Sequence, residues 1–168
     1  MLDLDGSQPP DWTRFARTRQ VSWREVQGMA RRHGRRIRAD YDLLVAIMRA
    51  GSPVATLLSQ QTGLPIDYLV CSRRNPEPFF LDGPARSPRM HRILLVDDVC
   101  GSGWTFVRCL RYCETLDNHV GTFSVFRCNA PGMFVPDFSM PADPQEYLRW
   151  PWEYQQESEM PRAGLLPA

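Results

Sequence analysis

Residues 93–105, which read Ile-Leu-Leu-Val-Asp-Asp-Val-Cys-Gly-Ser-Gly-Trp-Thr, decide the fold of this chain. Four apolar residues run directly into two acids, a short Gly/Ser loop follows, and a helical pattern begins at about Trp104. A continuous apolar run of this length is typical of a strand buried on both faces of a parallel sheet. Ligands of such sheets bind beyond the carboxyl ends of the strands, which is where Asp97 and Asp98 fall.

The loop after the two acids has the composition of a phosphate site. Its glycines leave backbone N–H groups unhindered at the start of a helix, and Ser102 and Thr105 add hydroxyls. Carboxylates beside such a cradle indicate a sugar phosphate held with a divalent cation. The alternatives are an ordinary acidic loop or the magnesium-binding strand of a P-loop NTPase. The P-loop requires a Gly-Lys-Ser/Thr sequence, and all 20 basic residues of this chain are arginines.

A second buried-strand pattern lies upstream, at residues 42–48, and is followed by Arg49-Ala50-Gly51-Ser52-Pro53. Proline suits the first turn of a helix, and Gly63 is placed to end that helix. An arginine in such a loop suits phosphate oxygens, because its planar fork can donate two hydrogen bonds.

Together these segments resemble the type I phosphoribosyltransferases, which use 5-phosphoribosyl 1-pyrophosphate (PRPP). Residues 93–105 resemble their PRPP motif, and residues 49–51 stand where they have a pyrophosphate loop. Residues 147–153, Tyr-Leu-Arg-Trp-Pro-Trp-Glu, resemble the C-terminal motif of the purine-type members, especially the xanthine–guanine enzymes and their archaeal relatives. Taken alone, these aromatics would be expected to cover a hydrophobic edge. The order of the three motifs favours the functional interpretation.

The resemblance implies an α/β fold: a mostly parallel, twisted sheet flanked by helices, with a small hood formed by the N- and C-terminal segments. It also implies a role for each motif. Asp97 and Asp98 would bind the ribose hydroxyls and the magnesium ion and take part in catalysis, and Glu153 would lie near the metal. Arg49, Ala50 and Gly51 would hold the pyrophosphate, and Arg49 would also be catalytic. PRPP binding involves Asp97, Asp98 and Val99 together with the residues that hold the 5′-phosphate, which are Cys100, Gly101, Ser102, Gly103 and Thr105. The base would stack on the Tyr147 ring, form hydrogen bonds with the Leu148 backbone and accept a hydrogen bond from Arg127.

Two departures from the purine members leave the acceptor base open. Gly101 stands where those members carry an acid that contacts the purine, and Arg127 stands in place of a lysine. We therefore expect a Mg²⁺-dependent phosphoribosyltransferase for a purine or purine-like base. The alternative is a non-catalytic domain of the same fold that senses PRPP or a nucleotide. A phosphate-ester hydrolase using the two acids ranks last, since further metal ligands are lacking.

Length and composition predict one domain, residues 16–154, between loose tails at 1–15 and 155–168. We expect a flexible loop at about 72–90 and the hood at about 127–154. No apolar run approaches the ~20 residues of a membrane span, and five cysteines without Cys-x-x-Cys spacing suit a reducing cytoplasm. The family often forms homodimers or higher homo-oligomers.

The segment after Ser22 predicts an amphipathic helix that begins with a capping box formed by Ser22 and Glu25. Its polar side is rich in arginine. Because such a face is more often solvated than bound to nucleic acid, nucleic acid is not expected as a partner. Residues 66–71 and 120–126 predict two further strands.

Overall fold

The computed structural model describes residues 15–72, 76–81, 88–128 and 132–153. The elements in chain order are β1 (Arg17–Gln20), α1 (Trp23–Asp40), β2 (Leu43–Met48), α2 (Gly51–Thr62), β3 (Ile66–Val70), β4 (Phe79–Phe80), β5 (Arg92–Cys100), α3 (Trp104–Glu114), β6 (His119–Arg127), β7 (Phe138–Pro141) and β8 (Glu146–Arg149). Residues 1–14 and 154–168, which include nearly all of the predicted tails at 1–15 and 155–168, lie outside the described residues.

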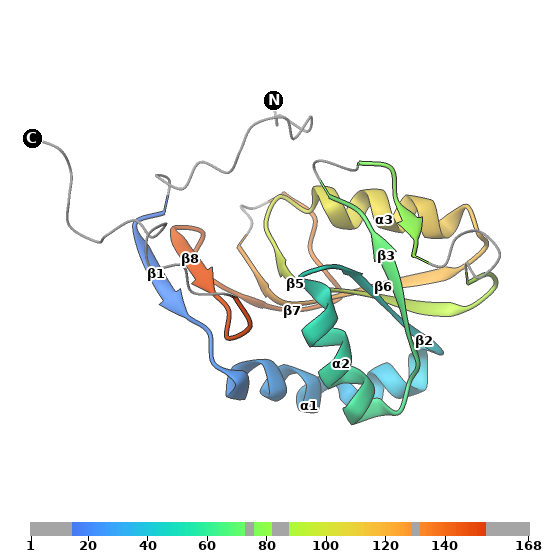
Figure 1. Ribbon diagram of the computed structural model, residues 1–168, viewed down its shortest axis with the longest axis horizontal. Coiled ribbons are helices and arrows are strands. Elements are labelled where there is room, and N and C mark those ends of the chain that lie inside the picture. Colours follow the sequence, from blue (N-terminus) through green and yellow to red (C-terminus); the bar gives the residue numbers. More distant parts are fainter. Residues whose placement is uncertain (1–14, 73–75, 82–87, 129–131, 154–168) are drawn as a thin grey trace, which may run out of the picture.

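A six-stranded sheet forms the centre of the molecule, in the order β4-β3-β2-β5-β6-β7 (Figure 1). Every pairing is parallel except that of β4 with β3. The segments from the two ends of the described chain meet in a separate parallel pair, β1 with β8. This pair joins the N- and C-terminal segments that the expected hood combines, whereas β7, which falls within the expected hood range of about 127–154, lies in the central sheet beside β6.

Helices cover both faces of the sheet, and the alternation of side chains along each strand divides the core in two. Leu94 and Val96 of β5 pack in a cluster with the apolar sides of α1 and α2. Their neighbours Ile93 and Leu95 pack in a second cluster with α3. All four are fully buried, which explains why the strand reads as an unbroken apolar run.

The helix boundaries follow the predicted local signals. The side chain of Ser22 accepts a hydrogen bond from the Glu25 backbone, and the Glu25 carboxylate accepts one from the Ser22 backbone, so the capping box at α1 is confirmed. Gly63 ends α2 in the left-handed conformation, with φ of 75°. No helix within the described ranges is long and apolar enough to cross a membrane.

Two regions differ from, or add to, the expected outline. β5 continues through the two acids to Cys100, because β6 stays paired beside it as far as Arg127. The acids therefore lie within a paired strand and not in the loop. The expected flexible loop at 72–90 contains β4, which pairs with the end of β3; residues 73–75 and 82–87 lie outside the described part, so its flexibility is not tested.

Candidate functional site

Two helices begin at the carboxyl edge of the sheet with an N-cap residue whose side chain makes no capping bond. These residues are Ala50 in α2 and Gly103 in α3, and in α3 the Ser102 hydroxyl accepts a long hydrogen bond of 3.4 Å from the Trp104 N–H. Helix α1 is different, since its first turn is closed by the capping box. The first N–H groups of a helix lack intrahelical partners and lie at the positive end of its dipole, so uncapped ends suit anions. The starts of α2 and α3, at the carboxyl edge of the sheet, are therefore suited to anions.

A pocket of about 130 Å³ opens where β5 meets α3. It is lined by Asp97, Val99, Cys100, Gly101, Ser102, Gly103, Trp104, Thr105 and Phe106. The structure therefore brings every residue of the predicted 5′-phosphate set together around one cavity, with the Asp97 carboxyl beside it. Cys100 is not a reactive group there, because burial raises the pKa of its thiol to about 12.

Phe134 packs against the loop at residues 100–103, and the sequence analysis did not predict this contact. Gly103 has φ of 82°, and a Cβ at this position would lie 2.4 Å from the Cβ of Phe134. The Phe134 ring stacks on Phe106 at 5.7 Å, and the Phe134 carbonyl accepts a hydrogen bond from the Cys100 thiol. No periodic pattern marks residues 132–136, so no signal in the sequence would have found this contact.

The loop of the predicted pyrophosphate site packs directly on β5. A Cβ on Gly51 would lie 2.2 Å from the Val96 carbonyl oxygen and 3.2 Å from the Cα of Asp97. Only glycine permits that approach. Arg49 and Ala50 are exposed at the same place, and the Met48–Arg49 peptide bond is cis. Both predicted phosphate sites therefore adjoin Asp97.

The two acids leave β5 on opposite faces, as neighbours in a strand do. Asp97 lines the phosphate pocket. Asp98 is buried on the other face, close enough to Glu153 for that charge to act on it. Burial, and then the charge of Asp98, raises the pKa of Asp97 well above its usual value. Burial is also the main cause that raises the pKa of Asp98 to about 7, and Glu153 adds to it.

The hood brings its own predicted residues to Asp98. The Glu153 carboxylate accepts hydrogen bonds from the Tyr147 hydroxyl at 3.4 Å and the Trp150 backbone at 3.0 Å. Tyr147 also packs against Phe15. The side chain of Leu148 is buried in the core, so only its backbone can meet a ligand. Arg127 stands apart, at the end of β6, where its charge acts on Cys100.

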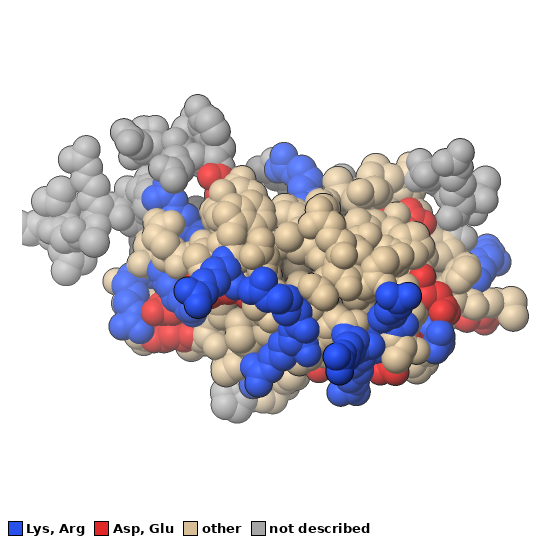
Figure 2. All heavy atoms as spheres, turned by 90° about the horizontal axis from the view of Figure 1, so that it is seen from below, with Lys and Arg blue, Asp and Glu red and all other residues tan. Residues whose placement is uncertain are grey.

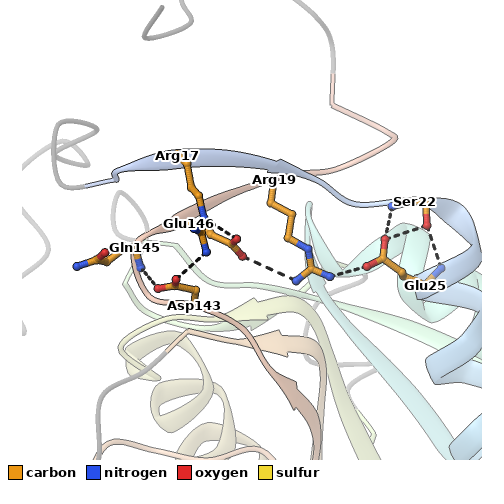
Figure 3. A network of polar contacts seen from close by, with 7 residues as sticks. All are labelled: Arg17, Arg19, Ser22, Glu25, Asp143, Gln145 and Glu146. Carbon is orange, nitrogen blue, oxygen red and sulfur yellow. Dashed lines mark hydrogen bonds and ion pairs between the residues drawn. The ribbon is translucent and has the colours of Figure 1, made fainter. Parts of the chain in front are cut away.

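Ion pairs fix the hood in place (Figure 3). Arg17 of β1 donates to Glu146, the first residue of β8, at 2.9 Å and to Asp143, which precedes β8, at 3.0 Å. Arg19 donates to Glu25 at the start of α1 and lies 3.9 Å from Glu146. Tyr147 follows Glu146 directly, so this network sets the position of the predicted stacking ring.

The carboxylates of the site fit a magnesium ion that is coordinated mainly by a bound substrate and water, and only in part by the protein. No group of three His, Cys, Asp or Glu side chains in the described ranges could hold a metal by itself. Within the described part of the chain, the Asp97 carboxylate accepts a hydrogen bond from the Asp98 backbone N–H, and the Asp98 carboxylate accepts one from the Val99 backbone N–H. Such carboxylates favour a nearby cation, and Mg²⁺ commonly uses one or two of them together with water and substrate phosphates.

Comparison with known proteins agrees with this geometry. Residues 17–140 match the family model described as "Phosphoribosyl transferase domain". No curated protein sequence matches the chain. Among solved structures, it resembles a purine phosphoribosyltransferase from Pyrococcus horikoshii, with a TM-score of 0.69, 19% identity, and coverage of 84% of this chain and 97% of that one.

Two further structures are similar. A hypothetical protein from Neisseria gonorrhoeae with bound ppGpp has a TM-score of 0.65 and 19% identity, over 84% of this chain and 93% of that one. A xanthine-guanine-hypoxanthine phosphoribosyltransferase from Helicobacter pylori has a TM-score of 0.64 and 18% identity, over 82% and 93%. At these identities the likeness concerns the fold.

Proposed function

Because this chain belongs to the phosphoribosyl transferase domain family, we propose that it transfers the phosphoribosyl group of PRPP to a purine or purine-like base, with Mg²⁺ as cofactor and release of pyrophosphate. The predicted family and the type I fold are confirmed. The proposal for this chain rests above all on the starts of α2 and α3, which both adjoin Asp97 of β5 and whose N-cap side chains make no capping bond.

The site residues take the following parts in this proposal. The 5′-phosphate binds in the pocket at the start of α3, against the backbone of residues 99–103 and the hydroxyls of Ser102 and Thr105. The pyrophosphate binds at the start of α2, against the N–H groups of Ala50 and Gly51 and the Arg49 guanidinium. Between these anions the ribose lies across the end of β5, where Asp97 and Asp98 accept from its hydroxyls.

Transfer then needs little covalent chemistry from the protein. A ring nitrogen of the base attacks C1′ while the bond from C1′ to the pyrophosphate oxygen breaks, and the bonding electrons leave with pyrophosphate. Arg49 and the α2 amides stabilise the charge on the leaving group, and each such preorganised donor typically contributes ~3–4 kcal/mol. Mg²⁺, when bound near Asp97, Asp98 and Glu153, would neutralise part of the pyrophosphate charge.

The base is placed in the hood. Tyr147 offers a ring for stacking beside Asp98, and the Leu148 backbone offers hydrogen bonds to the base edge. Arg127 supplies a donor on the other side of the β5 end. Gly101 leaves open space where a larger side chain could stand, since a Cβ there would meet nothing within 4 Å.

A second candidate is a domain that binds PRPP or a nucleotide without turning it over. Gly101 favours it, because the phosphate-binding elements persist while a base-contacting acid is absent. The Neisseria protein with bound ppGpp also favours it, because a phosphate-rich nucleotide is seen there on a similar fold.

The test is calorimetric titration with PRPP and Mg²⁺, followed by a pyrophosphate-release screen over purine and pyrimidine bases. Binding together with release for one base supports the transferase, and Asp97→Asn/Asp98→Asn should then abolish turnover while the protein still folds. Binding without release supports the sensing domain. Full activity of the double variant, or phosphate release without any base, contradicts the proposal.

A further inference from the structure

The exposed side of α1 carries a concentration of positive charge that the proposed function does not use. Six arginines of this helix are exposed: Arg24, Arg31, Arg32, Arg35, Arg36 and Arg38. Against the two acids Glu25 and Asp40 they give the helix a formal charge of +4. The whole chain is at +1, so the rest of it is at −3. Figure 2 looks onto the lower side of Figure 1, where α1 lies, and shows arginines across this face.

Five of these six arginines differ from those of the hood, because they form no ion pair within the described part of the chain. Arg17 and Arg19 are each neutralised by carboxylates. On α1, Arg36 pairs with Asp40 at 3.3 Å and lies over the Phe138 ring. The other five arginines of the helix form no ion pair with any residue that the structure describes. Their charge is therefore available to a ligand.

The spacing of the charges indicates a long ligand. Four of the arginines follow one another at intervals of seven, four and three residues, which keeps them on one side of a helix: Arg24, Arg31, Arg35 and Arg38. At 1.5 Å per residue this row extends over roughly 21 Å. A small anion would contact only part of it, whereas an extended polyanion can contact all of it.

The way α1 packs on the core bears on whether the polyanion is a lipid surface or a nucleic acid. A helix that lies embedded in a membrane surface inserts an exposed apolar side into the lipid, whereas a purely basic surface meets anionic lipids only through its charge. The apolar side of α1, which includes Val26, Met29 and Ile37, is buried in the core. Arginine's fork matches the oxygens of phosphodiesters. The sequence alone favoured a solvated face. The five arginines without an ion pair in the described part of the chain and the buried apolar side of α1 favour a face that binds a polyanion.

We propose that the arginine face of α1 binds the phosphate backbone of nucleic acid, without reading its sequence. The face is separate from the phosphate pocket. Helix α1 leads through a short turn into the start of β2, so the end that carries Arg31 to Arg38 lies toward the amino ends of the strands. The pocket lies beyond the carboxyl end of β5.

The experiment measures fluorescence anisotropy of labelled 20-nucleotide RNA, the same sequence as single-stranded DNA, and a 20-base-pair duplex, between 50 and 200 mM NaCl. Four arginines on four phosphates predict that the logarithm of the duplex association constant falls with the logarithm of salt concentration with a slope of about −3.6. Arg31→Glu/Arg35→Glu should weaken binding at least about tenfold at 50 mM. The control Arg89→Glu/Arg111→Glu changes the net charge equally at exposed positions outside α1 and should bind like the wild type.

Other outcomes overturn the proposal. They are no binding to any of the three nucleic acids at 50 mM salt, an equal loss in the control variant, displacement by polyglutamate as effective as by nucleic acid, or binding to phosphatidylserine vesicles in place of nucleic acid. If the Glu variant does not fold, Arg31→Gln/Arg35→Gln is measured and judged in the same way. The PRPP-dependent thermal shift of the variant should equal that of the wild type, so a failure of the proposed enzyme activity is recognised separately.

Discussion

At the scale of single residues, the acids of β5 show how burial changes a carboxyl group. Burial, with a contribution from Glu153, raises the pKa of Asp98 to about 7, while an aspartate in an unfolded chain ionises near pH ~4. Between these values the folded chain holds a proton that the unfolded chain has lost. The free energy of unfolding therefore falls as the pH rises through this window.

Asp98→Asn removes this charge and keeps the shape of the side chain. We expect the variant and the wild type to melt at the same temperature at pH 4, and the variant to melt at least about 3 °C higher at pH 8. Differential scanning calorimetry across this range measures the difference. A variant that is less stable at pH 8 than the wild type would show that the carboxylate is stabilised in the folded state.

Gly103 provides a second prediction at this scale. Gly103→Ala places a Cβ against Phe134 on a backbone with positive φ, so it should lower the free energy of unfolding by about 1–3 kcal/mol and weaken PRPP binding. Gly101→Ala is the matched control two residues away, where a Cβ meets nothing within 4 Å. Thermal melts compare the two variants, and PRPP titration compares Gly103→Ala with the wild type, because Gly101 itself lines the proposed phosphate pocket. Equal effects would mean that the Phe134 contact does not support the loop.

At the scale of elements, the hood joins the two ends of the described chain and carries the predicted base site. The parallel pairing of β1 with β8 and the ion pairs of Arg17 and Arg19 hold Tyr147 beside Asp98 and Glu153. Changes in the hood should therefore act on the base, while changes at the starts of α2 and α3 should act on PRPP.

Tyr147→Ala tests this division. Loss of a stacking ring costs ~1–3 kcal/mol per base, so the KM for the base should rise about 5- to 150-fold, with little change in the KM for PRPP. Tyr147→Phe keeps the ring and loses only the hydroxyl bond to Glu153, so its KM should stay close to that of the wild type. Steady-state kinetics with each substrate varied in turn makes the measurement. A larger effect on PRPP than on the base would exclude Tyr147 from the base site.

At the scale of the whole molecule, one sheet separates two apolar clusters. Two neighbouring residues of β5 lie in different clusters, so substituting each one tests one cluster. Leu94 lies in the cluster with α1 and α2, and Leu95 in the cluster with α3. Each substitution by alanine should lower the free energy of unfolding by about 2–5 kcal/mol. Leu81→Ala, at a side chain 51% exposed, should change it by less than about 0.5 kcal/mol.

Because the sheet is shared, we expect one cooperative transition in every variant. Urea unfolding followed by tryptophan fluorescence can distinguish the clusters, since Trp150 belongs to the first and Trp104 packs against the second. Two separate transitions would show that the faces of the sheet unfold independently.

Local patterns in the sequence determined the strands β2, β3, β5 and β6, the helix boundaries and the order of the ligand motifs, whereas β1, β4, β7 and β8 were not predicted. The apolar runs of β2 and β5, the capping box at Ser22 and the glycine after α2 each act within a few residues, so they can be read along the chain. The phosphate loop could be predicted for the same reason, because residues 99–105 are continuous.

Only the tertiary structure decided how the parts of the site face one another. Asp97 and Asp98 are neighbours in sequence yet lie on opposite faces, because β6 keeps the strand paired past both acids. Phe134 lies against Gly103, Gly51 against Val96 and Glu153 near Asp98, across 31, 45 and 55 residues respectively. Contacts over such separations depend on how strands and helices pack, and no local periodicity encodes them.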